Sequence, residues 1–330
     1  MAKTERVLVT GAGGSIGSAL CLRLAASGSP VTALVRTAGR AEHLLKAGIP
    51  VVEADIRDRV ALDRTLQDID VVMHLAAMHT HVGASDRDFH EINVQGARNV
   101  VEVAQRRGVR RVVHVSTIGV HGDTGRAGVS EDSPYAPMDV YTRTKLEGEL
   151  TVREVFDRGQ IEGVVVRPLG IYGPGDRRFM KLFKGVKKRR FPMIGRCDAI
   201  TQLCYIESFV DIMRRCADTP GIAGRVYIAG DVERPSVEEF VSLVADAVGG
   251  GPLPLRIPLL PTLVIAHMMQ AVCKPLGIDP PLYPRRLEFY TVNRVANVSR
   301  IAADLGFRTP STLQQRVSDT AAWYAAQGMI

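Results

Sequence analysis

The sequence of 330 residues predicts an α/β fold built on a doubly wound parallel sheet. Three observations indicate this class: short valine-rich runs recur, helix-patterned segments separate them, and the first run leads directly into a glycine-rich turn. Strands buried on both faces of a parallel sheet have nearly continuous apolar sequences. Their alternation with helices is typical of right-handed βαβ units. We therefore expect a Rossmann-type sheet with a smaller C-terminal lobe.

Six valine-rich runs define the expected strands, at residues 6–10, 31–36, 51–55, 70–76, 111–117 and 163–168. Helical patterns cover 16–27, 93–107 and 141–156. After residue 168 the rhythm changes, because a Gly-Pro-Gly break at 173–175 and a proline-rich remainder follow, with one further strand at 224–230. The expected nucleotide-binding Rossmann domain is 1–168 with returning segments near 200–230. The expected substrate-binding lobe is 169–199 and 231–330.

Composition places the chain among ordinary globular proteins. Hydrophobic residues make up 46% and charged residues 23%, which argues against disorder. The N-terminal sequence MAKTERVLVTG has no apolar stretch before a cleavage site, so we expect no signal peptide. Five cysteines without a CxxC pair disfavour a disulfide framework and a zinc site, and they suggest a reducing compartment. We expect a cytoplasmic protein without a metal.

The net charge of +7 indicates weak attraction to anions. Its one concentrated source is Lys181–Arg190, with six cations in KLFKGVKKRR. Because aromatic residues hardly interrupt this stretch, we favour a solvated face over a nucleic-acid groove and expect no nucleic-acid partner. A patch for an anionic substrate or a membrane surface is the second interpretation.

The glycine-rich turn predicts a dinucleotide site. Gly11, Gly14 and Gly17 lie in TGAGGSIG, between the first strand and the first helix, together with Ser15 and Ile16. Glycine there permits a tight turn and close backbone approach to a pyrophosphate at a helix N-terminus. The flanking strand and helix give this otherwise weak pattern its specificity.

Residues after the second and third strands indicate which dinucleotide binds. An acidic residue after the second strand would select NAD, but this chain has Arg36, followed by Arg40. A guanidinium suits a ribose phosphate, so NADP(H) is favoured, while an arginine lying over adenine would keep NAD(H) open. After the third strand, Asp55 could bind the adenine amino group with Ile56 against the ring. The alternative is that Asp55 caps the next helix.

A tyrosine and a lysine four residues apart predict the chemistry. Tyr141 and Lys145 share a helix face, and a nearby ammonium favours the phenolate and lowers the tyrosine pKa. Tyr141 could then exchange a proton with a substrate alcohol or carbonyl during hydride transfer. The fifth strand ends in Ser116 and Thr117, 24 residues before Tyr141, which places a hydroxyl at the same sheet edge.

With these residues in place, the chain resembles the extended short-chain dehydrogenase/reductase family over essentially its full length. The matching segments are TGAGGSIG, Asp55-Ile56, His74–Ala77, Asn93–Gly96, Val115–Thr117 with Gly122, Tyr141…Lys145, and Arg167–Asp176 (RPLGIYGPGD). The resemblance implies that Thr117, Tyr141 and Lys145 form the catalytic trio, that Lys145 also binds the nicotinamide ribose, and that Asn93 supports them. It further implies a cofactor lining of Leu75, Ala76, Ala77, Pro168, Leu169, Gly170 and Ile171. An alternative role for Asn93 is a helix N-cap.

The resemblance also ranks the branches of that family. Ile118-Gly119 follow Thr117 where dehydratases have Asp-Glu, so dehydration is disfavoured. Sugar-nucleotide epimerases usually carry Asn at Gly170 and Arg at Thr201, although Arg177, Arg178 or Arg196 could bind a diphosphate instead. RPLGIYGPGDRRF and YIES are closer to 3β-hydroxysteroid and sterol-carboxylate dehydrogenases. We therefore favour an alcohol dehydrogenase or ketone reductase acting on an apolar, steroid-like substrate.

Two further functions stay open from the sequence. One is a sugar-nucleotide epimerase or reductase using the same trio, and the other is a non-catalytic cofactor-sensing protein. In the family, two helices pair across a twofold axis, which here predicts a homodimer. Aliphatic residues of the matching helices support it: Val94, Val100, Val101, Val103, Ala104, Leu146, Leu150, Val152 and Val155.

Within the apolar segment Leu253–Ile278, the most apolar core spans 14 residues, too few for a membrane span, which needs about 20 apolar residues. Its core LLPTLVIAHMMQAV contains Pro261, His267 and Gln270. We expect it to close an elongated apolar pocket over the nicotinamide, with Tyr141 and Thr117 at the base. A buried core helix and an in-plane membrane contact are the alternatives.

Overall fold

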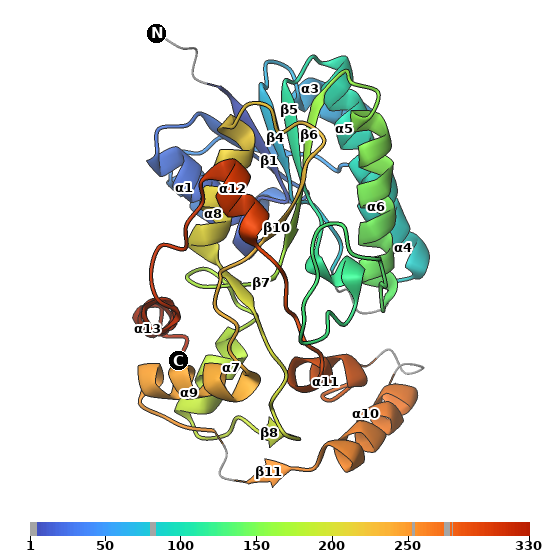
Figure 1. Cartoon of the computed structure of the whole chain (residues 1–330). Helices are drawn as coiled ribbons and strands as arrows, with labels where there is room; N and C mark the ends of the chain where they lie inside the picture. The colour runs from blue at the N-terminus through green and yellow to red at the C-terminus, as the bar shows by residue number, and fades with distance from the viewer. Residues whose placement is uncertain (1–4, 80–83, 253–254, 274–277, 279) are drawn as a thin grey trace.

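Seven parallel strands form the central sheet, in the order β10-β6-β5-β4-β1-β2-β3 (Figure 1). The computed structural model describes residues 5–79, 84–252, 255–273, 278 and 280–330. The strands are β1 (Val7–Thr10), β2 (Val31–Val35), β3 (Val51–Glu53), β4 (Val71–His74), β5 (Arg111–Val115), β6 (Glu162–Pro168) and β10 (Val226–Ala229). The strand order reverses between β1 and β4, where ligands bind in open α/β folds. The predicted fold class is confirmed.

Helices cover both faces of the sheet (Figure 1). On one face lie α1 (Ser15–Ala26), α8 (Ile206–Asp218) and α12 (Ser299–Leu305), and on the other α3 (Arg59–Thr65), α5 (Ala97–Arg106) and α6 (Val140–Phe156). Alternate strand residues supply the two cores, because successive side chains point to opposite faces. Val7 and Val9 belong to the first core and Leu8 to the second. Two short helices, α2 (Glu42–Lys46) and α4 (Asp86–His90), complete this half.

The helix expected over 93–107 begins differently. Residues Glu91–Gly96 form a π-helix that continues α4 into α5. Helix α6 crosses this segment closely, since a Cβ on Gly148 would collide with the Asn93 carbonyl oxygen. Gly96 is equally constrained, because a Cβ there would lie 2.5 Å from the Ile56 side chain. The crossing brings the helix that carries Tyr141 next to the segment that carries Asn93.

A second group of elements lies below the sheet in Figure 1. A short parallel pair joins it to the sheet half, β7 (Gly170–Tyr172) with β9 (Leu203–Tyr205). Beyond these strands come α7 (Met180–Lys187), β8 (Met193–Ile194), α9 (Val237–Val248), β11 (Arg256–Ile257), α10 (Leu259–Cys273), α11 (Pro284–Thr291) and α13 (Leu313–Ala326). We call these elements beyond β7 and β9 the lower lobe. The core where it joins the sheet half is aromatic: the Tyr172 ring packs against Phe179, Tyr205 and Phe240.

The segment 253–278 is only partly described, since residues 253–254 and 274–277 lie outside the described residues. Its described part forms β11 and α10, whose helix buries only Thr262 and Ala266. A buried core helix is therefore the wrong interpretation. Among the described helices, none combines the length and apolar character needed to cross a bilayer.

Candidate active site

A cleft of about 750 Å³ runs along the carboxyl ends of the strands. Its walls come from the turn after β1, the ends of β2 to β6, the start of α6 and the segment from Pro168 to Ile171. All the predicted cofactor positions lie on this wall: Gly11, Gly14, Ser15, Ile16, Gly17, Arg36, Asp55, Ile56, Leu75, Ala76, Ala77, Ser116, Tyr141, Lys145, Pro168, Leu169, Gly170 and Ile171. Residues from distant parts of the sequence thus share one surface, although their roles there remain predictions.

The glycine turn leaves room only for glycine. Gly11 has φ of +71°, and a Cβ there would lie 2.8 Å from the Ala76 backbone nitrogen. A Cβ on Gly17 would collide with the Gly11 carbonyl oxygen. Helix α1 begins at Ser15 after Gly14, whose position provides no side-chain cap for the first N–H groups. This cradle fits a pyrophosphate, because bare backbone N–H groups at a helix N-terminus bind anions.

Two exposed arginines lie on the cleft wall after β2. Arg36 and Arg40 both line the cleft, and Arg40 packs over the turn, since a Cβ on Gly13 would lie 3.2 Å from the Arg40 Cβ. The nearby Glu53 is turned away, because its carboxylate accepts a hydrogen bond of 2.7 Å from the Ala38 nitrogen. The end of β2 is therefore cationic on its cleft side.

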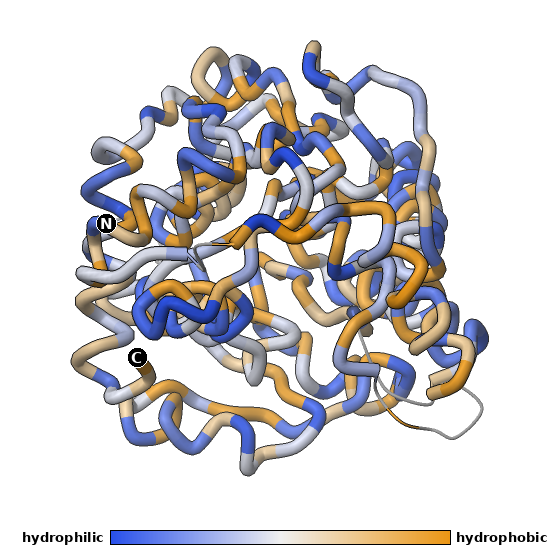
Figure 2. The backbone as a smooth tube through the Cα atoms, turned by 90° about the horizontal axis from the view of Figure 1, so that it is seen from below, coloured by the Kyte–Doolittle hydropathy of each residue, from blue (hydrophilic) through white to orange (hydrophobic). Residues whose placement is uncertain are grey.

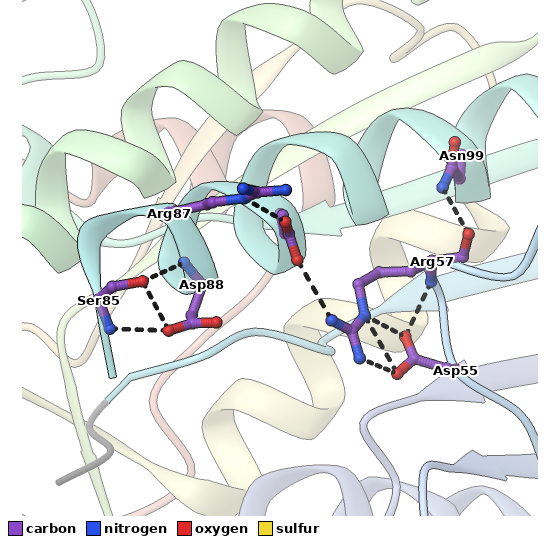
Figure 3. A network of polar contacts seen from close by, with 7 residues as sticks. Asp55, Arg57, Ser85, Arg87, Asp88 and Asn99 are labelled. Atoms are coloured by element: carbon purple, nitrogen blue, oxygen red, sulfur yellow. Dashed lines mark hydrogen bonds and ion pairs between the residues drawn. The ribbon is translucent and has the colours of Figure 1, made fainter. Parts of the chain in front are cut away.

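Asp55 is held by an arginine rather than capping a helix. The Asp55 carboxylate accepts from Arg57 Nη2 at 2.8 Å and from the Arg57 backbone nitrogen at 2.9 Å (Figure 3). This hydrogen bonding lowers the pKa of Asp55, so it is ionised at neutral pH. The cap of α3 is Asp58, which accepts from the nitrogens of Val60 and Ala61. The alternative that Asp55 caps that helix is wrong.

Arg57 links this carboxylate to the segment before the π-helix. Its Nη1 lies 3.3 Å from the Glu91 carboxylate, and Arg87 donates to the other oxygen of Glu91 at 2.8 Å. The Arg57 carbonyl also accepts from Asn99 Nδ2 at 3.3 Å (Figure 3). Sequence reasoning missed Arg57, and its only signal was its place two residues after Asp55.

Tyr141 and Lys145 project from the first turns of α6. Asp139 caps this helix in a reciprocal box with Thr142, which fixes where the helix starts. The Tyr141 ring lines the cleft and meets His79 edge-on, with centroids 4.5 Å apart. Lys145 is buried, and its Nζ donates to the Val115 carbonyl at 2.7 Å. Burial lowers the pKa of Lys145 to about 8, although Glu149 opposes the shift.

The hydroxyls at the end of β5 complete this part of the wall. Thr117 Oγ1 accepts from the Gly119 nitrogen at 3.1 Å and so begins the 3₁₀ turn Ile118–His121. The Thr117 hydroxyl proton is then directed elsewhere. Ser116 is buried, and among the described residues its Oγ has no hydrogen-bond partner.

Asn93 acts behind the cleft rather than on it. It is almost fully buried and does not belong to the described cleft wall. Its amide bonds the Met78 backbone in both directions, at 2.8 and 3.0 Å, and donates to Thr144 Oγ1 at 3.0 Å. The N-cap alternative is wrong, because Asn93 lies inside the π-helix. It fixes the chain after β4 against α6.

Among the wall residues that sequence reasoning did not assign to the site are Met78, His79, Arg178 and Arg294. The sequence suggested Arg178 only as a replacement diphosphate ligand, and of its companions neither Arg177 nor Arg196 is on the described wall. Arg294 had no sequence signal, since it lies 153 residues beyond Tyr141. The expected pocket wall at 253–278 is also wrong for the described part of that segment, because none of its residues lines the cleft.

No group of three or more His, Cys, Asp or Glu in the described ranges is placed to hold a metal ion.

Comparisons with known proteins agree with this architecture. The profile of the NAD dependent epimerase/dehydratase family matches residues 7–230. The chain is 29% identical over 317 residues to a 4-hydroxy-2-methyl-3-oxo-4-farnesyl-3,4-dihydroquinoline-1-oxide ketoreductase of Stigmatella aurantiaca, covering 94% of each chain. It is 30% identical over 342 aligned positions to a 3 beta-hydroxysteroid dehydrogenase/Delta 5-->4-isomerase of Mycobacterium tuberculosis, covering 97% of this chain and 90% of that one.

Among solved structures, the UDP-glucuronic acid 4-epimerase of Bacillus cereus in complex with UDP-glucuronic acid and NAD has the same fold. Its TM-score is 0.78 at 23% identity, with 98% of this chain and 99% of that chain covered. The family profile spans most of the chain, and the curated relatives extend the match over nearly all of it. The chain therefore belongs to the NAD dependent epimerase/dehydratase family, a family of enzymes within the extended short-chain dehydrogenases/reductases.

Proposed function

We propose that the protein is an NADP(H)-dependent oxidoreductase that interconverts a secondary alcohol and a ketone on an apolar, steroid-like substrate. One observation carries this proposal: Thr117, Tyr141 and Lys145 share the wall of the cleft that contains the glycine cradle. When bound in that cleft, the nicotinamide dinucleotide supplies or accepts the hydride.

The three side chains divide the remaining work. The Tyr141 hydroxyl gives its proton to a ketone oxygen, or takes one from an alcohol. The Lys145 ammonium lies one helical turn away and favours the phenolate by its charge. Thr117 Oγ1 already accepts from Gly119, so its proton is directed to the reacting oxygen and holds it beside Tyr141. Asn93 positions the segment after β4 without touching the reacting atoms.

The cationic end of β2 supports NADP(H) over NAD(H). Arg36 and Arg40 offer donors to a ribose phosphate, and the Glu53 carboxylate is engaged with the Ala38 nitrogen. Asp55, fixed by Arg57, is oriented to accept from the adenine amino group. The Bacillus cereus enzyme is solved with NAD. The proposal of NADP(H) for this chain therefore rests on its own arginines and not on that structure.

Two arginines on the cleft wall are already paired within the protein, which favours an apolar substrate over a diphosphate. Arg178 donates to the Asp176 carboxylate at 2.8 Å and to the Ile171 carbonyl at 2.7 Å. Arg294 donates to the Glu288 carboxylate at 3.2 Å and to the Gly122 carbonyl at 3.1 Å. Both charges are compensated within the protein, so a diphosphate would have to compete for them. Both curated relatives named above act on ketones or steroids according to their names.

The runner-up is a sugar-nucleotide epimerase or reductase. It is favoured by one observation: Arg178 and Arg294 both stand on the cleft wall, where released ion pairs could hold a diphosphate. The UDP-glucuronic acid complex of the Bacillus cereus enzyme shows that this fold accommodates such a substrate.

A substrate panel separates the two proposals. The purified protein is incubated with NADPH and a series of ketosteroids and long-chain ketones, and with NADP⁺ or NAD⁺ and UDP-sugars. We expect NADPH absorbance to fall when the apolar ketones are added. The rate of this turnover should be about 10²-fold or more lower in Tyr141→Phe. Epimerised UDP-sugar with no ketone turnover would move the function to the runner-up.

We also propose a homodimer formed through α5 and α6. Few of the predicted interface residues are available for this dimer, because seven of the nine supporting aliphatic residues are already buried within one chain. Leu150 on α6 remains 41% exposed and marks the surface concerned. Light scattering at low concentration should give a dimer mass for the native protein and a monomer mass for Leu150→Glu.

A further inference from the structure

Exposed apolar side chains are concentrated on one helix of the lower lobe. Of the fourteen large hydrophobic side chains that are exposed among the described residues, seven lie between Leu255 and Ile278. Four of them repeat every fourth residue along α10, namely Leu260, Val264, Met268 and Val272, with Ile265 beside them. Residues four apart share one helix face. We call these five residues the α10 stripe.

The α10 stripe inverts the usual pattern of a surface helix. A surface helix turns its large apolar residues inward and its charges outward. Helix α10 instead buries the small residues Thr262 and Ala266 and leaves Leu260 75% and Met268 64% exposed. No acidic or basic residue other than His267 occurs between Leu259 and Cys273. A contiguous apolar surface of this kind marks a contact with a partner or a membrane.

Neither the cleft nor the protein core accounts for the α10 stripe. The stripe does not line the described cleft, and α10 meets the hydrophobic core through other residues, namely Ala266 with Leu259 and Leu263. Its 15 residues amount to about 22 Å, shorter than the roughly 30 Å hydrocarbon core of a bilayer. A helix of this length with an exposed apolar face fits in the plane of a membrane surface.

Exposed cations lie on the same lobe. All six cations of Lys181–Arg190, on α7 and the turn after it, are exposed, and within the described residues none forms an ion pair. This basic stretch leads within three residues to β8, which pairs with β11 directly before α10. The turn after β8 also meets the helix start, since a Cβ on Gly195 would lie 3.3 Å from the Leu259 Cβ. Figure 1 places α7, β8, β11 and α10 at the same end of the molecule, and Figure 2 looks onto that end.

Two carboxylates close to β8 and β11 already pair with arginines outside the stretch. Glu238 is paired with Arg256, and Asp198 lies 3.3 Å from both Arg126 and Arg196. A second copy of this chain would offer the stripe an apolar surface, but its net charge of +7 makes it a poor partner for the six cations. An anionic bilayer offers both, because its headgroups attract the cations and its acyl boundary accepts the stripe.

We propose that α10 lies in the plane of an anionic lipid bilayer, with the α10 stripe inserted at the acyl boundary and the basic stretch Lys181–Arg190 against the headgroups. This proposal stands apart from the proposed function, since neither group of residues belongs to the cleft wall.

Vesicle flotation tests it with the full-length protein. Phosphatidylcholine vesicles containing phosphatidylglycerol are compared with vesicles of phosphatidylcholine alone, at low and at raised salt. We expect the protein to float with the anionic vesicles, and Val264→Glu/Met268→Glu to reduce its vesicle affinity about tenfold or more. Lys187→Glu/Lys188→Glu should weaken binding at low salt and remove most of its salt dependence.

The matched control is Val60→Glu, at a side chain 62% exposed on α3, which should bind vesicles as the native protein does. Unchanged thermal unfolding and unchanged NADPH affinity of the variants show that the cleft is intact, whatever the outcome for turnover. Failure of the native protein to float, or equal flotation of the α10 variants, overturns the proposal. A lower mass of the α10 variants in light scattering, without any vesicle binding, would assign the stripe to a second copy instead.

Discussion

Arg167 on β6 donates to both carboxylate oxygens of Glu149 on α6, at 3.0 and 2.5 Å, and neither side chain is exposed. The same guanidinium donates to the Glu131 carbonyl at 2.8 Å and to the Tyr135 hydroxyl at 2.9 Å. Glu149 lies one helical turn after Lys145 and raises the pKa of that lysine. The pair therefore anchors α6 to the sheet and keeps a second buried charge near Lys145 compensated.

Breaking this pair should cost more than removing an exposed partner of the same carboxylate. Arg167→Met removes the guanidinium that bonds both oxygens of the buried Glu149 carboxylate, so we expect a loss of about 3–5 kcal/mol in the free energy of unfolding. Arg153→Ala removes a guanidinium 3.7 Å from Glu149 at the surface and should cost less than about 1 kcal/mol. Urea denaturation of both variants measures the difference, and equal losses would contradict the anchoring role.

The activity should fall as pH rises through about 8. Burial lowers the pKa of Lys145 to about 8, so the ammonium that favours the Tyr141 phenolate is lost above that pH. The pH profile of kcat/KM with an apolar ketone should show this descending limb. In Lys145→Arg, a guanidinium keeps its charge, so the limb should move out of the accessible range even though overall activity is reduced. If the descending limb of the pH profile is unchanged in Lys145→Arg, a group other than Lys145 causes it.

Dinucleotide preference should reverse in Arg36→Asp. A carboxylate repels a ribose phosphate and accepts from a ribose hydroxyl pair, so NADPH affinity should fall and NADH affinity should rise. Losing one charge-assisted pair corresponds to about 10-fold or more in the dissociation constant. Fluorescence titration with both dinucleotides checks this, with Arg59→Asp outside the cleft as the control. Tighter NADH binding by the native protein would remove the argument from Arg36.

A buried histidine should make the protein sensitive to acid. His114 lies beside His74, with ring centroids 5.2 Å apart, and both its nitrogens lack a hydrogen-bond partner among the described residues. Burial lowers the pKa of His114 well below its usual value, so the unfolded chain takes up a proton that the folded chain excludes. Stability is therefore lost as pH falls below about 6.5.

The variant His114→Leu removes this group with little change in volume. We expect it to unfold at equal or higher temperature than the native protein, and to lose less stability between neutral and mildly acidic pH. His90→Gln, at an exposed histidine, should leave both properties unchanged. Melting temperatures across this pH range test the prediction. A His114→Leu variant that melts below the native protein at neutral pH would show that the His114 ring makes a stabilising contact.

Local pattern alone determined the sheet, the glycine cradle and the Tyr141–Lys145 pair. Apolar runs indicate burial, the spacing of Gly11, Gly14 and Gly17 indicates a tight turn before a helix, and a spacing of four indicates a shared helix face. Each of these signals lies within a short stretch of sequence. The confirmed fold class and the family rest on these short-range signals.

Tertiary structure decided what lies opposite each residue. Asp55 offered a carboxylate after a strand, but only the fold showed that Arg57 takes it and that Asp58 caps the helix. For Asn93 the sequence left a helix cap open as an alternative, but the residue holds the Met78 backbone, because α6 crosses a π-helix there. Arg294 lies on the cleft wall although it is far along the chain from the other wall residues, and no periodic pattern in the sequence predicts this position. Helix α10 is the plainest example of what the sequence could not predict. Its sequence shows that it is apolar, but only the packing of Thr262 and Ala266 determines which face is covered and which is exposed to solvent.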